Sequence, residues 1–295
     1  MGISQEMHII QFVDKSKPYS RNMTEARLDT THNTPLLRFS CMDMFSWLSF
    51  GFTTKLGGVS EGHCASLNLG WKQGDTHENV CENYRRACES LVGNPDKLVF
   101  SDQIHEDKVA YVTESDCAGS SFAKMLKGTD GMITDIPGVI LATSYADCVS
   151  LFFVDPVNRC IGSSHSGWRG TVKKIGEKTI EKMEQQFGSN PKDIVCLIGP
   201  SICQSCYEVS GDVIEQFMNN YSEKYYKDIF TDTGRSGKYK LDLWAAVWHQ
   251  LRDAGMREEN IYLSGICTYC NHKLLFSHRK TNGKRGALNG LIKIN

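Results

Sequence analysis

The sequence predicts one mixed α/β domain, in which strands and helices alternate along the chain. Short apolar runs typical of buried strands interleave with amphipathic helical patterns from residue 50 onward. The 295 residues contain no long linker, internal repeat or low-complexity block at which a second domain would begin. The composition, with 40% hydrophobic and 23% charged residues, is that of a globular protein.

The first 45 residues are predicted to be an N-terminal extension packed on the core, and residues 46–295 the main domain. Ile9–Val13 is apolar enough for a strand, whereas Asp14–Thr34 is polar and predicts an irregular segment. The N-terminus lacks the cationic start and apolar run of a signal peptide. No apolar stretch approaches the roughly 20 residues that a membrane span requires. We therefore expect a cytoplasmic protein with no membrane partner.

The main domain shows a regular succession of elements. Three helices are predicted. The first covers Glu78–Val92 and stops before Asn94-Pro95, the second covers Val172–Phe187 and ends at Gly188, and the third covers Leu241–Ala254 and ends at Gly255. Buried strands are predicted over Leu98–Phe100, Val139–Ala142, Ser150–Val154, Cys160–Ser163, Ile194–Ile198 and Ile261–Leu263.

Charge and cysteine content narrow the class of protein. The formal net charge of −1 excludes the broad basic surface of a duplex-DNA binder, so no nucleic-acid partner is expected. The 12 cysteines are too few for a small fold built on disulfides. In a reducing cytosol they are expected to be thiols or metal ligands.

Three residues stand where α/β proteins place ligand sites, at the ends of predicted strands. His105 follows the strand Leu98–Phe100, Cys148 precedes an apolar strand, and His165 ends the strand that begins at Cys160. A catalytic zinc site uses three such protein ligands and keeps one position open. The three residues are far apart in sequence and form no local motif, so ordinary core or edge positions are the alternative.

Two Cys-x-x-Cys pairs add a second possibility. They are Cys203-Gln204-Ser205-Cys206 and Cys267-Thr268-Tyr269-Cys270. Together they could form a four-cysteine zinc site, although their separation is far longer than that of a zinc ribbon. A thioredoxin-like pair and small buried residues are the alternatives.

Eight sequence blocks, in order, closely resemble the laccase-domain family once labelled polyphenol oxidases. The blocks are Phe52-Thr53-Thr54-Lys55-Leu56-Gly57-Gly58-Val59-Ser60, Gln103-Ile104-His105, Thr129-Asp130-Gly131, Ala146-Asp147-Cys148, His165-Ser166-Gly167-Trp168-Arg169-Gly170-Thr171, Ile198-Gly199-Pro200 with Tyr207-Glu208-Val209, Leu241-Asp242-Leu243-Trp244, and Cys267-Thr268 with Phe276-Ser277-His278-Arg279. The resemblance runs from about residue 50 to the C-terminus.

This resemblance implies a four-layer α/β/β/α sandwich in which His105, Cys148 and His165 are zinc ligands and catalytic residues. It implies purine nucleoside phosphorylase, adenosine deaminase and methylthioadenosine phosphorylase activities in one site. Purine nucleosides and phosphate would be the partners, and the chain would be a monomer or weak homo-oligomer. Asp130 could orient a ligand.

Substrate or phosphate contacts are expected from charged and polar residues in the same blocks: Lys55, Ser60, Arg169, Asp147, His278 and Arg279. Two positions depart from the family pattern. Lys55 stands where the family usually has Arg, and Glu106 where it usually has Gly.

Three other functions compete with the zinc nucleoside enzyme. Cys148 could be a nucleophile with His165 as its base, in a thiol hydrolase or peptide-editing enzyme. A copper phenol oxidase fits the older family label, but the chain has nine His and no His-x-His pair. A binding protein that has lost catalysis would fit the departures at Lys55 and Glu106.

Overall fold

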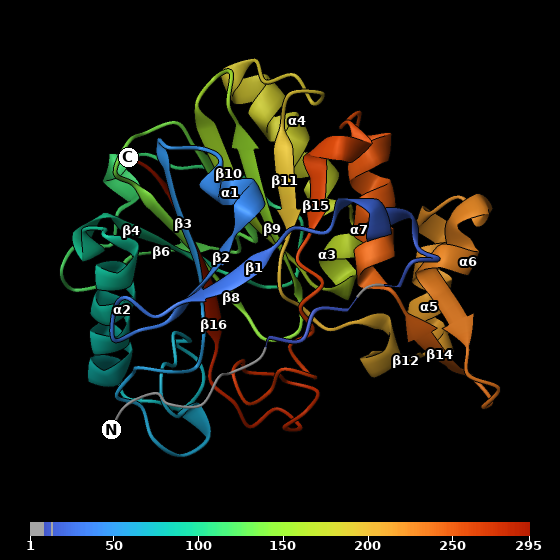
Figure 1. The fold of residues 1–295 in the computed structure, drawn as a ribbon, viewed down its shortest axis with the longest axis horizontal. Coiled ribbons are helices and arrows are strands. Elements are labelled where there is room, and N and C mark those ends of the chain that lie inside the picture. The colour runs from blue at the N-terminus through green and yellow to red at the C-terminus, as the bar shows by residue number, and fades with distance from the viewer. Residues whose placement is uncertain (1–8, 13) are drawn as a thin grey trace.

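Two β-sheets packed face to face form the centre of the molecule (Figure 1). The computed structural model describes residues 9–12 and 14–295, and over these residues there are three sheets. The first has the order β1 (Ala26–Asp29), β2 (Leu36–Phe39), β3 (Leu48–Thr53), β16 (Leu288–Ile294), β8 (Ile140–Tyr145), β4 (Leu98–Asp102), β6 (Met125–Lys127). The second has the order β15 (Ile261–Leu263), β11 (Val195–Ile198), β9 (Val149–Asp155), β10 (Cys160–Ser166), β7 (Gly131–Thr134), β5 (Val109–Tyr111). A small third sheet has the order β12 (Glu208–Ser210), β14 (Lys238–Leu241), β13 (Phe230–Asp232).

Helices cover the outer faces of both central sheets, which gives four layers in the order α/β/β/α (Figure 1). The α-helices are α1 (Ser40–Asp43), α2 (His77–Leu91), α3 (Trp168–Val172), α4 (Ile175–Phe187), α5 (Gly211–Asn220), α6 (Tyr226–Ile229) and α7 (Leu243–Asp253). The 3-10 helices are η1 (Pro18–Asn22), η2 (Gly62–Cys64), η3 (Pro95–Lys97), η4 (Glu114–Asp116), η5 (Gln204–Cys206), η6 (Glu223–Tyr225) and η7 (Glu258–Asn260). Helix α2 packs on the first sheet, α4 and α7 pack on the second, and α5 packs on the third.

The alternation of side chains along the strands produces three separate cores. On β9, Phe153 packs under α4 and α7, whereas its neighbour Phe152 points between the two central sheets. On β8, Ile140 packs against α2 and Leu141 points between the sheets. Both strands are buried on both faces, which is why their sequences read as nearly continuous apolar runs.

Most elements predicted for the main domain are confirmed to within a few residues. The helix predicted from Glu78 is α2, and the six buried strands are β4, β8, β9, β10, β11 and β15. Gly188 ends α4 with φ of 69°, a left-handed conformation that costs glycine little. The helix predicted from Leu241 begins two residues later, because the Asp242 carboxylate caps it by accepting from the N–H of Ala245.

The helix predicted over Val172–Phe187 is confirmed as α4, which begins three residues later, at Ile175. A short helix that was not predicted, α3, ends at Val172, and Lys174 between the two helices has φ of 61°. The N-terminal turn of α4 is held on α7, since the N–H of Gly176 donates to the Gln250 side chain at 3.0 Å.

The N-terminal segment also differs from expectation. The strand predicted over Ile9–Val13 is a single bridge between Gln11 and Ile266. Val13 and residues 1–8, which include the N-terminus considered for a signal peptide, lie outside the described residues. The segment predicted as irregular contains η1 and strand β1. Burial hardly alternates along β1, so the sequence shows no apolar pattern from which this strand could be recognised. The strand is defined by its antiparallel pairing with β2. Through β2 and β3, residues 26–39 continue the first sheet.

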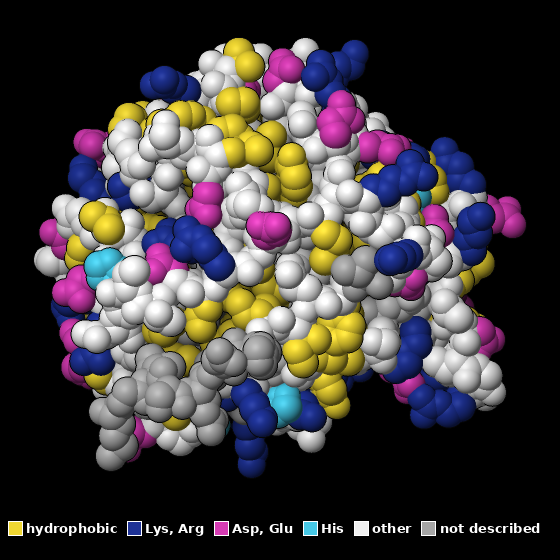
Figure 2. Space-filling view, in the orientation of Figure 1, with side chains coloured by type: hydrophobic (Ala, Val, Ile, Leu, Met, Phe, Trp, Pro, Cys, Tyr) yellow, Lys and Arg dark blue, Asp and Glu magenta, His cyan; other side chains and the backbone are white. Residues whose placement is uncertain are grey.

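Lys and Arg side chains are interspersed with Asp and Glu on the face shown in Figure 2, as the near-zero net charge suggests. None of the helices within the described residues has the length and apolar character needed to cross a bilayer.

The packing between the two central sheets can be tested at Phe152. Its ring centroid lies 4.8 Å from that of Phe50, and the side chain is fully buried. We expect Phe152→Ala to lower the free energy of unfolding by about 3–5 kcal/mol, because it leaves a cavity between the sheets. Urea denaturation followed by fluorescence measures this change. The control is Val157→Ala, since Val157 is 69% exposed and its loss should change stability by less than about 0.5 kcal/mol. Equal stability of the two variants would contradict the inter-sheet core.

Candidate metal centre

The structure brings the three predicted ligands together at one end of the two central sheets. His105 follows β4, Cys148 directly precedes β9, and His165 lies within β10. The Cys148 Sγ is 3.8 Å from the His105 Nε2, and the three donor atoms all lie within 4.8 Å of one another. His165 is buried, Cys148 half-buried and His105 exposed, so the cluster is anchored in the core and open on one side.

The buried carboxylate of Asp130 organises both histidines. It accepts hydrogen bonds from the backbone N–H groups of Ile104, His105 and Glu106, each at 3.0 Å. It also bonds the Nδ1 of His165 at 2.9 Å. Burial acts to raise the pKa of Asp130, but these bonds outweigh it and lower the pKa. An ionised Asp130 requires Nδ1 of His165 to carry the proton, which leaves Nε2 free to bind a metal.

The loop that carries His105 is held in an unusual conformation. His105 has φ of 63°, a left-handed value that is uncommon for residues other than glycine. On the other side of the loop, both ends of the Gln103 amide bond the backbone of Ser144, at 2.8 and 3.0 Å. The His105 ring is therefore positioned by bonds to its neighbours on both sides.

The loop that carries Cys148 is held by Asp147. Asp147 has φ of 87°, and its two carboxylate oxygens accept from the Thr268 hydroxyl and the Arg279 N–H, each at 2.6 Å. Its carbonyl oxygen accepts from the N–H of Ile202 at 2.9 Å. These bonds fix the turn that presents Cys148 to the two histidines.

The electrostatics of the cluster favour a thiolate. Burial acts to raise the pKa of Cys148, but His165 and His105 outweigh it and lower the pKa to about 6. Burial acts in turn to lower the pKa of His165, but the Cys148 and Asp130 charges raise it to about 9. A thiolate is the form of cysteine that binds metals and the form that acts as a nucleophile.

The donor set fits zinc. A tetrahedral site with Zn–S near 2.3 Å and Zn–N near 2.0–2.1 Å places sulfur and nitrogen about 3.6 Å apart, close to the 3.8 Å between Cys148 and His105. Three ligands with a carboxylate behind one histidine are typical of catalytic zinc.

The open side of the cluster faces a pocket of about 660 Å³, its mouth included. Trp71 and Arg285 are among the lining residues that were not predicted from the sequence. Within the described residues, the Trp71 Nε1 and the Arg285 Nε have no hydrogen-bond partner although both are buried. A buried donor without a partner is costly, which suits a ligand that would accept from it. The Gly283-Lys284-Arg285-Gly286 turn could have indicated Arg285, since glycines flank its Lys-Arg pair.

The six residues predicted to contact substrate are not among those lining this pocket, and their role stays a prediction. The Lys55 Nζ donates to the His272 carbonyl at 2.8 Å, and the Ser60 hydroxyl donates to Asp75 at 2.5 Å. Both groups thus have internal partners, as Asp147 has. Glu106, where the family usually has Gly, pairs with Lys173.

The other three lie at the surface. The exposed Arg169 stacks over the Trp168 ring at 4.2 Å. Arg279 donates to the Glu208 carbonyl at 2.8 Å and, with Trp168, lines a separate groove. His278 is exposed.

Known proteins resemble this chain over most of its length. The family model described as multi-copper polyphenol oxidoreductase laccase matches residues 49–295. Purine nucleoside phosphorylase YlmD of Bacillus subtilis is 37% identical over 82% of this chain and 87% of its own. Adenosine deaminase RL5, from an unknown prokaryotic organism, is 33% identical over 78% of this chain and 87% of its own. The crystal structure of the hypothetical protein YfiH of Bacillus licheniformis superposes with a TM-score of 0.85 at 35% identity, covering 91% of this chain and 99% of that one.

The close approach of Gly167 to the cluster gives a test of the geometry. A Cβ added at Gly167 would lie 2.8 Å from the His105 ring and 3.1 Å from the Cys148 Sγ. We expect Gly167→Ala to weaken zinc binding by about 10- to 100-fold, because the donors must move apart. Competition with a chelating dye measures this affinity. In the control Gly211→Ala, the added Cβ meets only Tyr239, at 3.8 Å, and the affinity should not change. Equal affinity in both variants would show that zinc does not bind between His105 and Cys148.

Proposed function

The chain belongs to the multi-copper polyphenol oxidoreductase laccase family, and from that membership we propose that it is a zinc-dependent purine nucleoside enzyme. The proposed reactions are phosphorolysis of adenosine, inosine, guanosine and methylthioadenosine, and hydrolytic deamination of adenosine to inosine. One observation carries the proposal, the cluster of His105, Cys148 and His165 at the base of an open pocket. The names of the relatives described above support the substrate class.

In this proposal His105, Cys148 and His165 hold the zinc ion. When bound, zinc supplies a Lewis acid that can lower the pKa of a coordinated water from 15.7 to about 7. Asp130 holds the Nδ1 side of His165, so that Nε2 is the nitrogen left to face the metal, and it holds the His105 loop against the cluster. Asp147 acts by positioning Cys148, since both of its carboxylate oxygens are already bonded.

Phosphorolysis needs a cation that brings phosphate to C1′ of the ribose. There a phosphate oxygen forms the new C1′–O bond while the C1′–N9 bond to the purine breaks. Arg285 is the guanidinium that lines the pocket, and its buried Nε has no hydrogen-bond partner within the described residues. The Trp71 indole can donate to a polar atom of the nucleoside. Arg169, Arg279 and His278 are the second candidates for phosphate: they lie outside the pocket lining, but Arg169 is four residues after His165 and the Arg279 N–H bonds Asp147, next to Cys148.

A second function is favoured by one specific observation. Cys148, His165 and Asp130 form a chain of thiol, imidazole and carboxylate, and the pKa of the thiol is lowered to about 6 by the histidines against the effect of burial. The same order of groups activates the nucleophile of thiol hydrolases. A peptide-editing or other thiol hydrolase would use Cys148 to attack a carbonyl and would need no metal.

Zinc content and product analysis separate the two functions. We expect protein purified without added metal to contain zinc bound at the cluster, and Cys148→Ala to lose it, because a thiolate is the strongest ligand of the three. With adenosine and phosphate, the zinc-loaded protein should yield adenine or, through inosine, hypoxanthine, detected by liquid chromatography. Full activity on a thioester or amide substrate after removal of zinc would instead establish the thiol hydrolase. No product from any purine nucleoside with zinc bound would contradict the nucleoside enzyme.

The role of Arg285 can be tested by kinetics. We expect Arg285→Gln to raise the KM for phosphate by about 10- to 100-fold, since a charge-assisted hydrogen bond contributes about 1.5–3 kcal/mol. Deamination of adenosine uses no phosphate and should change much less, and zinc content should be unchanged. Arg235→Gln is the control, because Arg235 is exposed and pairs only with Glu208 among acidic residues. If the KM for phosphate is unchanged in Arg285→Gln but raised in Arg169→Gln, phosphate binds at Arg169 and not at Arg285.

A further inference from the structure

The two Cys-x-x-Cys pairs follow two adjacent parallel strands, so the fold brings them together. Strands β11 and β15 pair in parallel, with Ile198 opposite Leu263. The pairing continues beyond the strands as a parallel bridge between Ser201 and Cys267. The N–H of Thr268 donates to the Ser201 carbonyl at 3.1 Å. The chain therefore leaves both strands at the same end of the sheet and enters a Cys-x-x-Cys loop each time.

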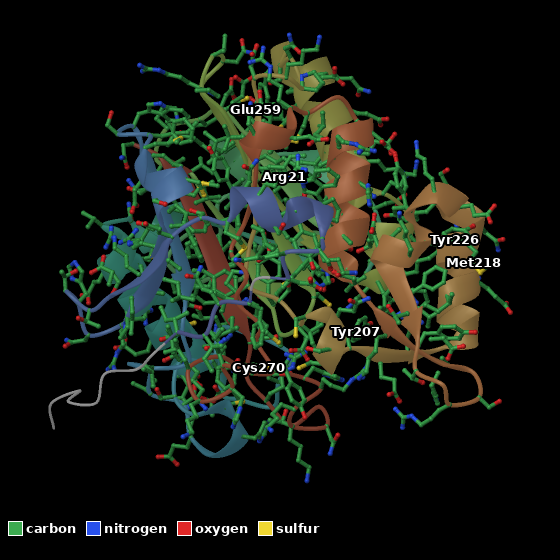
Figure 3. The ribbon with its side chains drawn as sticks, turned by 45° about the vertical axis from the view of Figure 1, so that its right-hand side comes forward. Arg21, Tyr207, Met218, Tyr226, Glu259 and Cys270 are labelled. Atoms are coloured by element: carbon green, nitrogen blue, oxygen red, sulfur yellow. The ribbon has the colours of Figure 1, made fainter. Side chains whose placement is uncertain are left out.

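The four sulfur atoms form one cluster, and all lie within 4.8 Å of one another. The Sγ atoms of Cys206 and Cys270 are 3.4 Å apart, and the N–H of Cys203 donates to the Sγ of Cys267 at 3.4 Å. Cys203 and Cys267 are buried, whereas Cys206 and Cys270 are half-buried and give a path from solvent. Figure 3 shows the labelled Cys270 in the loops below the sheets, on the side where Tyr207 follows the other pair.

We propose that Cys203, Cys206, Cys267 and Cys270 bind a second zinc ion whose role is structural. Four thiolates around zinc at 2.3 Å lie about 3.8 Å apart, which fits this cluster. Two Cys-x-x-Cys loops are a usual way to supply four ligands to structural zinc.

The chemistry of the cluster without a cation supports this assignment. Several thiolates cannot be held so close together unless a cation compensates them. The surroundings reduce the remaining negative charge, because the Lys240 Nζ donates to the Ser205 carbonyl at 2.9 Å within the first loop. The Ser205 hydroxyl, at 3.1 Å, can donate to the Cys203 sulfur.

The second zinc would join the two loops that hold Asp147. The N–H of Ile202, directly before Cys203, donates to the Asp147 carbonyl, and the hydroxyl of Thr268, directly after Cys267, donates to the Asp147 carboxylate. Asp147 in turn positions Cys148. The metal at the four cysteines is thus a positioning element for the first cluster, although its existence does not depend on the activity proposed above.

Metal analysis of single variants tests the proposal. We expect wild-type protein purified without added metal to contain about two zinc ions per chain, and Cys206→Ser and Cys148→Ala to contain about one each. Cys117→Ser is the matched control, since Cys117 is another half-buried cysteine and lies outside both clusters. It should keep about two. Cobalt loaded into Cys148→Ala should show the sulfur-to-cobalt charge-transfer and visible bands of a four-thiolate site. Cys206→Ser should also unfold at a lower temperature than Cys117→Ser.

The proposal would be overturned by a Cys206→Ser variant with the zinc content of the wild type. It would also be overturned by disulfides joining these four cysteines in peptides mapped without reduction. If Cys206→Ser does not fold, alkylation of the wild-type protein tests the same site. Cys206 and Cys270 should react with iodoacetamide only after a chelator has removed zinc, and equal labelling with and without the chelator would contradict the site.

Discussion

The buried Asp130 carboxylate is the interaction on which the candidate centre depends. It gathers three consecutive backbone N–H groups of one loop and the imidazole of His165 from a neighbouring strand. A buried carboxylate with a single partner would be costly, whereas one with four donors is stable and rigid. His105, which belongs to the same loop, is thereby fixed relative to His165 by a group outside the three candidate donors. Removing Asp130 would leave both imidazoles free to turn.

Two of the residues that present the donors lie in a strained backbone conformation. His105 and Asp147 both have positive φ, and each such conformation costs of order 1–3 kcal/mol for a residue other than glycine. Each is offset by hydrogen bonds from a separate part of the chain, from Asp130 in one case and from Thr268 and Ile202 in the other. The four-cysteine cluster lies behind the second set of bonds, so the distant C-terminal loops contribute to the position of Cys148.

Sequence patterns predicted the regular elements well because strands such as β9 are buried on both faces and helices such as α2 have clear stops. They failed where long-range contacts decide the local structure. The short helix α3 and the turn at Lys174 were not predicted, and the first turn of α4 is held by Gln250 in another helix. The ends of predicted strands suggested the grouping of His105, Cys148 and His165, and the family resemblance singled it out, because spacing holds no information about residues joined by sheet topology. Arg285 was missed because its pocket exists only once β16 is paired.

The donors come from both central sheets, which makes the metal geometry sensitive to how these sheets pack. His105 follows a strand of the first sheet, His165 lies in the second, and Cys148 lies where the chain crosses from β8 to β9. Phe152, four residues after Cys148, fills the space between the sheets and approaches Gly290 so closely that a Cβ there would clash with it. A metal site tolerates displacements of only about 0.5 Å. A defect in the inter-sheet core would therefore move the three candidate donors apart before it unfolds the chain.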